Sequence, residues 1–109
     1  MNGYNLLDEA AKLLGLDNAD ENMKIIGLPL LNEIIVDLGF MPLASLSETL
    51  GIAAPVTLSA LRFGVAALVA NAVGEKENAT ALFELYSQKK TRLSSKIERV
   101  KDVLPRGEQ

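Results

Sequence analysis

Histidine and cysteine, the side chains that most often serve as general bases and thiolate nucleophiles, are both absent from this chain of 109 residues. The remaining serine, tyrosine and carboxylate side chains follow no spacing typical of a catalytic motif, and no glycine-rich phosphate-binding loop occurs. The same composition excludes a thiolate metal site. We therefore expect a protein that is not an enzyme, that uses no cofactor or metal, and that acts by binding other protein surfaces.

A small acidic cluster, formed by Asp17, Asp20 and Glu21, is the one group of carboxylates that suggests a cation site. The full ligand pattern of a calcium-binding loop is missing around it. Asp17 and Asp20 also stand where the cap of a following helix is needed. We interpret the cluster as helix capping and not as a cation site.

Basic residues form a regular series near the end of the chain. Lys89, Arg92, Lys96 and Arg99 follow one another at steps of 3, 4 and 3 residues, which places them along one flank of a helix. Three surroundings suit such a flank: the acidic surface of an adjacent identical subunit, the phosphates of a nucleic acid, or solvent beside the negative end of the helix dipole. The net charge of -3 and the lack of interleaved aromatic residues argue against sequence-specific nucleic-acid binding.

The two halves of the chain carry opposite charge. Residues 1–61 contain eight Asp and Glu against two Lys, whereas residues 62–109 contain nine Lys and Arg against six Asp and Glu. Acidic surfaces of one copy are therefore suited to lie beside basic surfaces of the next copy.

Length and composition predict a single folded domain over residues 1–109. The chain is 49% hydrophobic and 23% charged, which is enough apolar material for a core and too much for a disordered chain. Residues 1–8 lack the charged and apolar regions of a secretory signal, so we expect Met1 to be the true start. The absence of cysteine fits a cytosolic origin.

Apolar residues recur at steps of 3 and 4 between glycine and proline positions, which is typical of helices. We predict helices over residues 6–14, 20–38, 57–73 and 78–104, with a loop over 40–56. Asn5 and Asp20 are expected to cap the first two helices, and Gly15 and Gly39 to end them. Pro29 predicts a kink in the second helix, or a helix that effectively starts later. The expected fold class is all-α, a small four-helix bundle with a long C-terminal helix.

The 40–56 loop and the third helix both bear on how the core is built. The loop is long for a helix-to-helix link and is either functional or pinned to the core by its apolar residues, Leu43, Leu46, Leu50 and Ile52. The third helix is apolar almost all round, which indicates a central position. Its length approaches that of a membrane span, but Arg62 and Asn71 lie inside it and favour a buried helix without a membrane. Arg62 must then reach the surface or pair with a carboxylate.

The fourth helix is expected to carry the binding surface. It spans roughly 27 residues, about 40 Å at 1.5 Å per residue, and is longer than the other three. Its apolar stripe narrows to Leu93, Ile97, Val100 and Leu104, a coiled-coil-like seam that needs one partner helix. We expect the last turns to overhang the domain with this seam exposed. The alternative is a helix that folds back or frays after Arg99.

The run from Ala60 to Arg92, ALRFGVAALVANAVGEKENATALFELYSQKKTR, resembles the head-tail connector, or adaptor, proteins of long-tailed bacteriophages. In that family an apolar helix with a Leu-Pro/Arg-Tyr/Phe-Gly-x-Ala-like start leads through a turn into a helix with a Leu-Tyr-x-x-Lys/Arg-like core. The matching residues here are Leu61, Arg62, Phe63, Gly64 and Ala66 for the first feature, and Leu85, Tyr86, Lys89 and Lys90 for the second. The N-terminal half agrees more loosely, through residues 10–15 (AAKLLG) and 30–38 (LLNEIIVDL). These motifs mark packing positions and are no active-site signature.

The resemblance implies a phage or prophage virion structural protein that forms a homo-oligomeric ring, typically of twelve copies. The ring would lie between the portal and the tail-completion proteins, with DNA passing non-specifically through its centre. Before assembly the protein would be found in the host cytoplasm. The resemblance assigns residues 97–104 and the following 105–109 to the portal side. Because the chain ends soon after Leu104, the extended C-terminal arm of some relatives is short or missing here.

Two other functions remain open from the residues alone. One is a small DNA-binding or packaging accessory protein whose Lys89, Arg92, Lys96 and Arg99 contact phosphates. The other is a regulatory adaptor that uses the fourth helix in a heterodimeric coiled coil.

Overall fold

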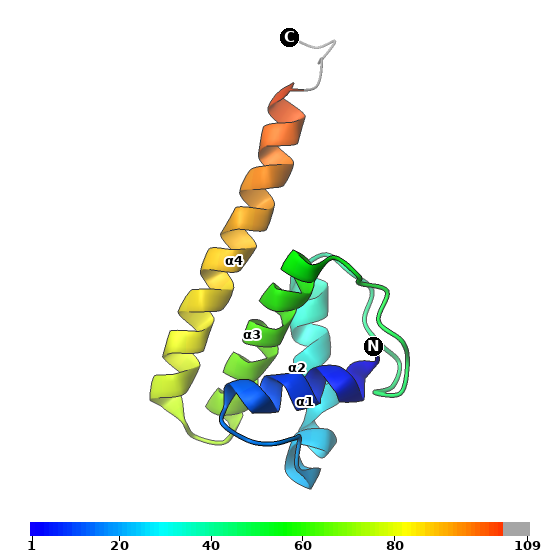
Figure 1. Ribbon diagram of the computed structural model, residues 1–109, viewed down its shortest axis with the longest axis vertical. Coiled ribbons are helices and arrows are strands. Elements are labelled where there is room, and N and C mark those ends of the chain that lie inside the picture. Colours follow the sequence, from blue (N-terminus) through cyan, green and yellow to red (C-terminus); the bar gives the residue numbers. More distant parts are fainter. Residues whose placement is uncertain (104–109) are drawn as a thin grey trace.

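The computed structural model describes the backbone of residues 1–103 and the side chains of residues 1–93, and this part of the chain is all-helical. Four helices follow in order: α1 (Gly3–Leu13), α2 (Glu21–Asp37), α3 (Pro55–Ala72) and α4 (Lys76–Val103) (Figure 1). Within residues 1–103 no strand is present, and the extended pairing there is an isolated β-bridge between Asn2 and Thr49. The predicted all-α class and the four helices are confirmed.

Helix α1 begins three residues before the predicted start because Asn2, and not Asn5, is its N-cap. The Asn2 side chain accepts a hydrogen bond from the Asn5 amide, and the Asn5 side chain accepts one from the Asn2 amide, each at 2.9 Å. This reciprocal pair satisfies two amide groups that a helix start otherwise leaves open. The earlier start places Asp8 in mid-helix, where its carboxylate accepts a hydrogen bond from the Ala19 amide at 2.9 Å.

The stop of α1 lies where glycine predicted it. Gly15 has a φ of 85°, and the amides of Gly15 and Leu16 donate back to the carbonyls of Lys12 and Ala11. Near this end of the helix, Leu13 is 39% exposed, whereas Ala11 is fully buried.

Helix α2 has the predicted cap and the predicted stop. The Asp20 carboxylate accepts a hydrogen bond from the Met23 amide at 2.9 Å, and Gly39 ends the helix with a φ of 93°. Pro29 lies inside the helix with its ring exposed to solvent. The helix is continuous across Pro29, so the expectation of a later start is wrong.

The linker between α2 and α3 is anchored to the helices by buried side chains spaced along it. Its four leucine and isoleucine side chains are buried, as the core-pinning interpretation required: Leu43, Leu46, Leu50 and Ile52. The Asn32 side chain on α2 donates to the Leu43 carbonyl at 2.9 Å and accepts from the Leu43 amide at 2.7 Å. The linker also bonds to the N-terminus through Tyr4 with Leu46 and Leu50 with Met1. The Asn32 side chain therefore satisfies the backbone amide and carbonyl of Leu43, which have no secondary-structure partner in this irregular segment.

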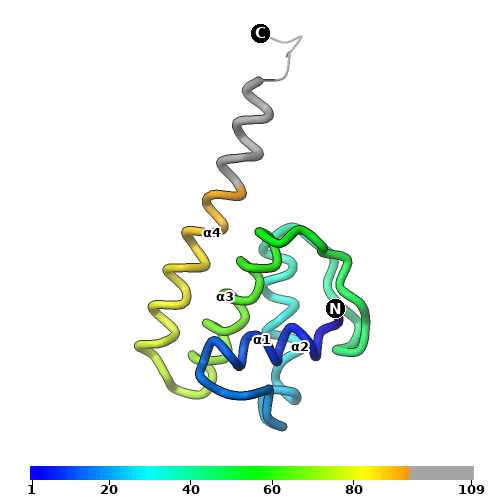
Figure 2. Tube along the Cα trace, viewed as in Figure 1, coloured from blue at the N-terminus to red at the C-terminus, as the bar shows by residue number. Residues whose placement is uncertain are grey.

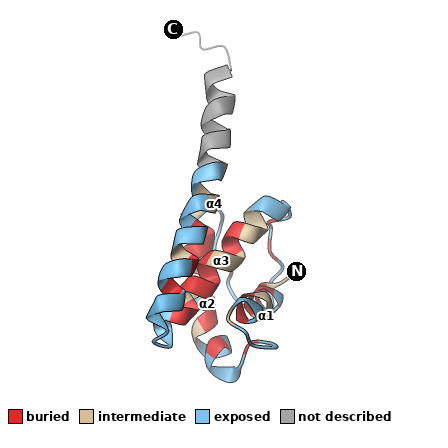
Figure 3. Ribbon diagram, turned by 60° about the vertical axis from the view of Figure 1, so that its left-hand side comes forward, coloured by how far each residue is buried: buried red, intermediate tan, exposed pale blue. Residues whose placement is uncertain are grey.

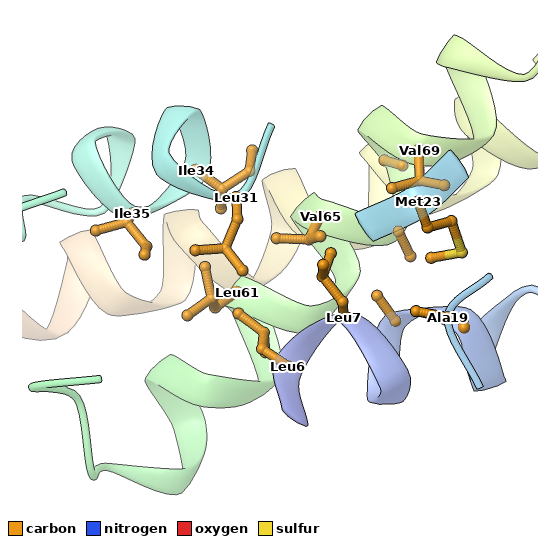
Figure 4. Close-up of a cluster of buried hydrophobic side chains, with 14 of the residues drawn as sticks. Leu6, Leu7, Ala19, Met23, Leu31, Ile34, Ile35, Leu61, Val65 and Val69 are labelled. Atoms are coloured by element: carbon orange, nitrogen blue, oxygen red, sulfur yellow. The ribbon is translucent and has the colours of Figure 1, made fainter. Parts of the chain in front are cut away.

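Helix α3 starts at Pro55, two residues before the predicted start. Proline was assigned to the loop, but the first helical position needs no N–H donor and suits its fixed φ. Helices α1, α2 and α4 all pack against α3, and its residues form much of the buried layer (Figure 3). Figure 4 shows Leu61, Val65 and Val69 of α3 among side chains of α1 and α2. The predicted central position of this helix is confirmed.

Arg62 is the charged residue inside this apolar helix. Its guanidinium donates to the Glu9 carboxylate on α1 at 2.8 Å, with both side chains about one-third exposed. The expected carboxylate partner is therefore present. Within the described residues, α3 is the helix whose length and composition suit a membrane span, but its buried residues face the other helices and belong to the shared core.

Helix α4 starts at Lys76, two residues before the predicted 78, and runs antiparallel beside α3 (Figure 2). Ala79, Leu82 and Tyr86 are buried against the core, and Leu93 is half-buried against it. The helix is assigned to Val103, so the predicted end at Leu104 lies outside the described residues.

Replacing Asn32 with alanine tests how the linker is fixed. The change leaves the partly buried amide and carbonyl of Leu43 without their partners, and we expect the free energy of unfolding to fall by about 2 kcal/mol. Urea denaturation measures the loss. Asn22→Ala, at an exposed position of the same helix, is the matched control and should change stability by less than about 0.5 kcal/mol. Equal losses in the two variants would contradict this role for Asn32.

Candidate protein-interaction surface

The attachment of α4 to the rest of the protein includes a polar cluster formed by Tyr86, Asp37 and Lys90. The Tyr86 hydroxyl donates to the Asp37 carboxylate, and the Lys90 ammonium donates to the same carboxylate oxygen at 2.8 Å. Asp37 is the last residue of α2, where a carboxylate opposes the helix dipole, and the last turn of α2 contains no basic residue. Tyr86 and Lys90 therefore supply from α4 the hydrogen-bond donor and positive charge that the end of α2 lacks.

This cluster shifts two pKa values in opposite directions. The hydrogen bond from Lys90, followed by the one from Tyr86, lowers the pKa of the Asp37 carboxyl below its ordinary value. Burial, together with the hydrogen bond to Asp37, raises the pKa of the Tyr86 hydroxyl. The ionised carboxylate and the neutral phenol are thus the forms that join α2 to α4.

Replacing Tyr86 with phenylalanine tests the cluster by its pH dependence. The lowered pKa of Asp37 stabilises the fold above the ordinary carboxyl pKa, and this contribution is lost as the pH falls through the lowered value. The raised pKa of Tyr86 stabilises the fold below the ordinary phenol pKa, and this contribution is lost as the pH rises above it. We therefore expect Tyr86→Phe to be less stable than the wild type by about 1 kcal/mol between roughly pH 4 and pH 10, with a smaller difference outside this window.

Chemical denaturation across this pH range measures the effect. Tyr4→Phe is the matched control. Tyr4 is exposed, so loss of its hydroxyl group should leave the free energy of unfolding unchanged across the pH range. A Tyr86→Phe deficit that does not vary with pH would indicate a packing effect alone.

A shallow groove lies where the start of α3 faces α4. Pro55, Val56 and Ser59 form one side and Lys89 and Arg92 the other, around a cavity of about 340 Å³. The Lys89 ammonium lies 4.9 Å from the centre of the Phe63 ring, which is a cation-π distance. The α3 side of the groove is therefore largely apolar, and the α4 side carries two cations of the predicted basic series.

The predicted interaction residues fall into two groups in the structure. Lys89 and Arg92 line the groove together. Leu93 is half-buried against the core, so the first position of the predicted seam already contributes to the fold. The side chains of the other candidates, Lys96, Ile97, Arg99, Val100 and Leu104, lie outside the described residues, as does the 105–109 segment.

The sequence prediction missed the role of Asp37 and Lys90. A carboxylate at the last position of a helix without a basic residue in that turn signals that another element must supply the charge. In the acidic cluster, Asp20 is a cap as predicted, whereas Asp17 is exposed and caps no helix. No group of three or more metal-ligating side chains gathers within the described residues.

Comparison with known proteins adds no assignment: no protein-family model matches the chain, and no curated protein and no solved structure matches it either. The candidate function is therefore inferred from the geometry of α4 and its groove, and the resemblance to phage connectors stays a prediction.

Proposed function

We propose that this chain is a phage or prophage virion structural protein, a head-tail connector whose copies form a ring between the portal and the tail-completion proteins. Assembly is the whole mechanism: the protein catalyses no reaction, uses no cofactor and inserts into no membrane. In this proposal the chain is a four-helix bundle with a long C-terminal helix, and that helix joins one copy to its neighbours and to the portal.

The observation that carries the proposal is the unequal length of α3 and α4. The first turn of α3 lines the groove with Arg92, so α3 starts level with that turn of α4. Helix α4 is assigned as far as Val103, about 16 Å beyond Arg92 at 1.5 Å per residue. No turn of α3 stands opposite this stretch (Figure 1). In the sequence, the apolar spacing of Ile97, Val100 and Leu104 continues along and just past this stretch, and such spacing suits a partner helix in another copy.

Several of the family-like residues lie at packing positions, although Leu85, another of them, is 41% exposed. Leu61, Gly64, Ala66 and Tyr86 are buried where α3 meets its neighbours. Lys90 lies in the cluster that joins α4 to α2. The resemblance implied that its matching residues pack the two helices together. The burial of these residues supports the resemblance but identifies no functional site.

The charge pattern suits a ring around DNA. A net charge of -3 and an acidic N-terminal half limit tight binding of DNA, which must slide through a channel. The basic residues of α4 lie on one helix and are suited to meet acidic surfaces of a neighbouring copy. In the ring, contact with DNA is then non-specific.

A DNA-binding accessory protein is the second candidate, favoured by the open cationic groove. Against it, Lys90 is paired with Asp37 and Lys89 lies over Phe63, so two cations of this region already have partners within the chain. A regulatory adaptor that forms a heterodimeric coiled coil through α4 is the third.

The mass of the protein in solution, measured across a range of concentrations, tests self-assembly. We expect rings or higher oligomers at high concentration, and we expect the double change Val100→Asp with Leu104→Asp to weaken them by at least tenfold, because two charges would enter an apolar seam. Ala81→Asp with Gln88→Asp, at exposed positions of the same helix, is the matched control and should leave the oligomers intact.

Other outcomes would direct the assignment elsewhere. Salt-dependent retention of DNA by a strictly monomeric protein would favour the accessory protein. Capture of one unrelated helical partner at fixed stoichiometry, lost in the Val100→Asp and Leu104→Asp variant, would favour the adaptor.

A further inference from the structure

We propose that neighbouring copies join head to tail, with the turn between α1 and α2 of one copy docking into the groove between α3 and α4 of the next. The docking turn presents Leu16 and Asp17, and the groove presents Val56, Lys89 and Arg92. This inference rests on the proposed ring and names a contact within it.

The groove is suited to an acidic and apolar occupant. Val56 is 51% exposed on the α3 side of the groove, and Arg92 is exposed on the α4 side. Helix α3 starts there without a side-chain cap, since Ala54 offers none, and the first intrahelical amide bond is the one from Leu58 to Ala54. The positive end of the α3 dipole therefore adds to the charge of Lys89 and Arg92. A carboxylate next to an aliphatic side chain matches this surface.

The α1–α2 turn has this chemistry and is held in shape. Leu16 is 44% exposed, and its amide donates to the Ala11 carbonyl at 3.0 Å. Ala19, two residues after the exposed Asp17, is buried and donates its amide to Asp8. Because both sides of the turn are anchored, Leu16 and Asp17 are presented with little loss of entropy on binding.

The turn and the groove lie at opposite ends of the helical body, so the turn of one copy cannot reach the groove of the same copy. Figure 4 places Ala19 and Met23 near Val69, in the last part of α3, whereas the groove lies at the first turn of α3. Val56 and Val69 are 13 residues apart on α3, which is about 20 Å along the helix. Contact between two different surfaces is heterologous, and repeating it produces a closed ring or an open filament. A second copy of this chain is therefore the occupant that the three charged and two apolar side chains of the contact favour.

Engineered cysteines test the contact directly, because the native chain has no cysteine. We expect the full-length Leu16→Cys and Val56→Cys double variant to form a ladder of disulfide-linked copies under mild oxidation, seen on a non-reducing gel. Each single variant should give at most a linked dimer. The matched control is Leu16→Cys with Val36→Cys, because Val36 is exposed to a similar degree, 55%, but lies on α2 away from the groove. A ladder no longer than that of this control would overturn the docking.

Charge exchange provides a second test that does not depend on cysteine. Asp17→Arg and Arg92→Glu should each weaken association about tenfold, because each places like charges in contact. A mixture of the two variants should recover most of the association, since residues 17 and 92 then carry opposite charges at every contact between unlike copies. Far-ultraviolet circular dichroism of each variant confirms that it is folded. Failure of the mixture to recover association would overturn the proposed contact.

The two proposals fail in different ways. Oligomers in solution without a cysteine ladder would mean that the ring forms through other surfaces, so that the docking is wrong and the connector function stands. If the cysteine ladder forms and the Val100→Asp and Leu104→Asp change does not weaken the oligomers, the docking is supported and assembly through α4 is refuted.

Discussion

Close packing around Gly64 of α3 is the constraint on which the arrangement of the helices depends. A β-carbon built at this position would lie 2.8 Å from Ile34 of α2 and 2.9 Å from the Tyr86 ring of α4. Two helices therefore approach α3 at one level, and only the smallest side chain leaves room for both. The same approach brings Tyr86 within reach of Asp37, so that a packing requirement and a hydrogen bond specify one relative position of α2, α3 and α4.

Helix α1 and the linker complete the packing around α3 by different means. The absence of a side chain at Gly27 of α2 leaves room for Leu7 of α1. The linker adds its buried leucine and isoleucine side chains to the same core. An irregular segment has unpaired backbone groups, and Asn32 satisfies those of Leu43 where burial would otherwise be costly. Asn32 thus adds a polar contact to the apolar packing of the linker.

Periodicity and capping chemistry predicted much of this fold, and the errors have physical causes. Asp20, Gly15 and Gly39 act through their own neighbours in sequence, so their effect on helix ends could be recognised without a structure. The start of α1 was misplaced because Asn2 and Asn5 are both good caps, and tertiary contacts between the N-terminus and the linker favour the first. Pro55 was read as a loop residue although proline also suits a first helical position.

The candidate surface was harder to predict because it depends on which residues meet across the fold. The spacing of Lys89 and Arg92 indicated a shared flank, and they do line one groove. No local pattern reveals that Val56 lies opposite them, or that Lys90 joins Asp37, because these pairs are separated by more than 30 residues in sequence. Such contacts arise only when α3 and α4 are packed side by side.

The position of the Tyr86, Asp37 and Lys90 cluster also determines how α4 responds to mechanical load. A force applied at the C-terminal end of α4 would peel the helix from α3 starting at Arg92, and the next turns reached are those of Lys90 and Tyr86. These two turns are hydrogen-bonded to the end of α2, which packs against α3 and is itself held by the linker. A load at the end of α4 is thereby passed to the centre of the body before the α3–α4 turn is strained, because the cluster anchors α4 near its middle, with Lys90 13 residues from Val103 and 14 from Lys76.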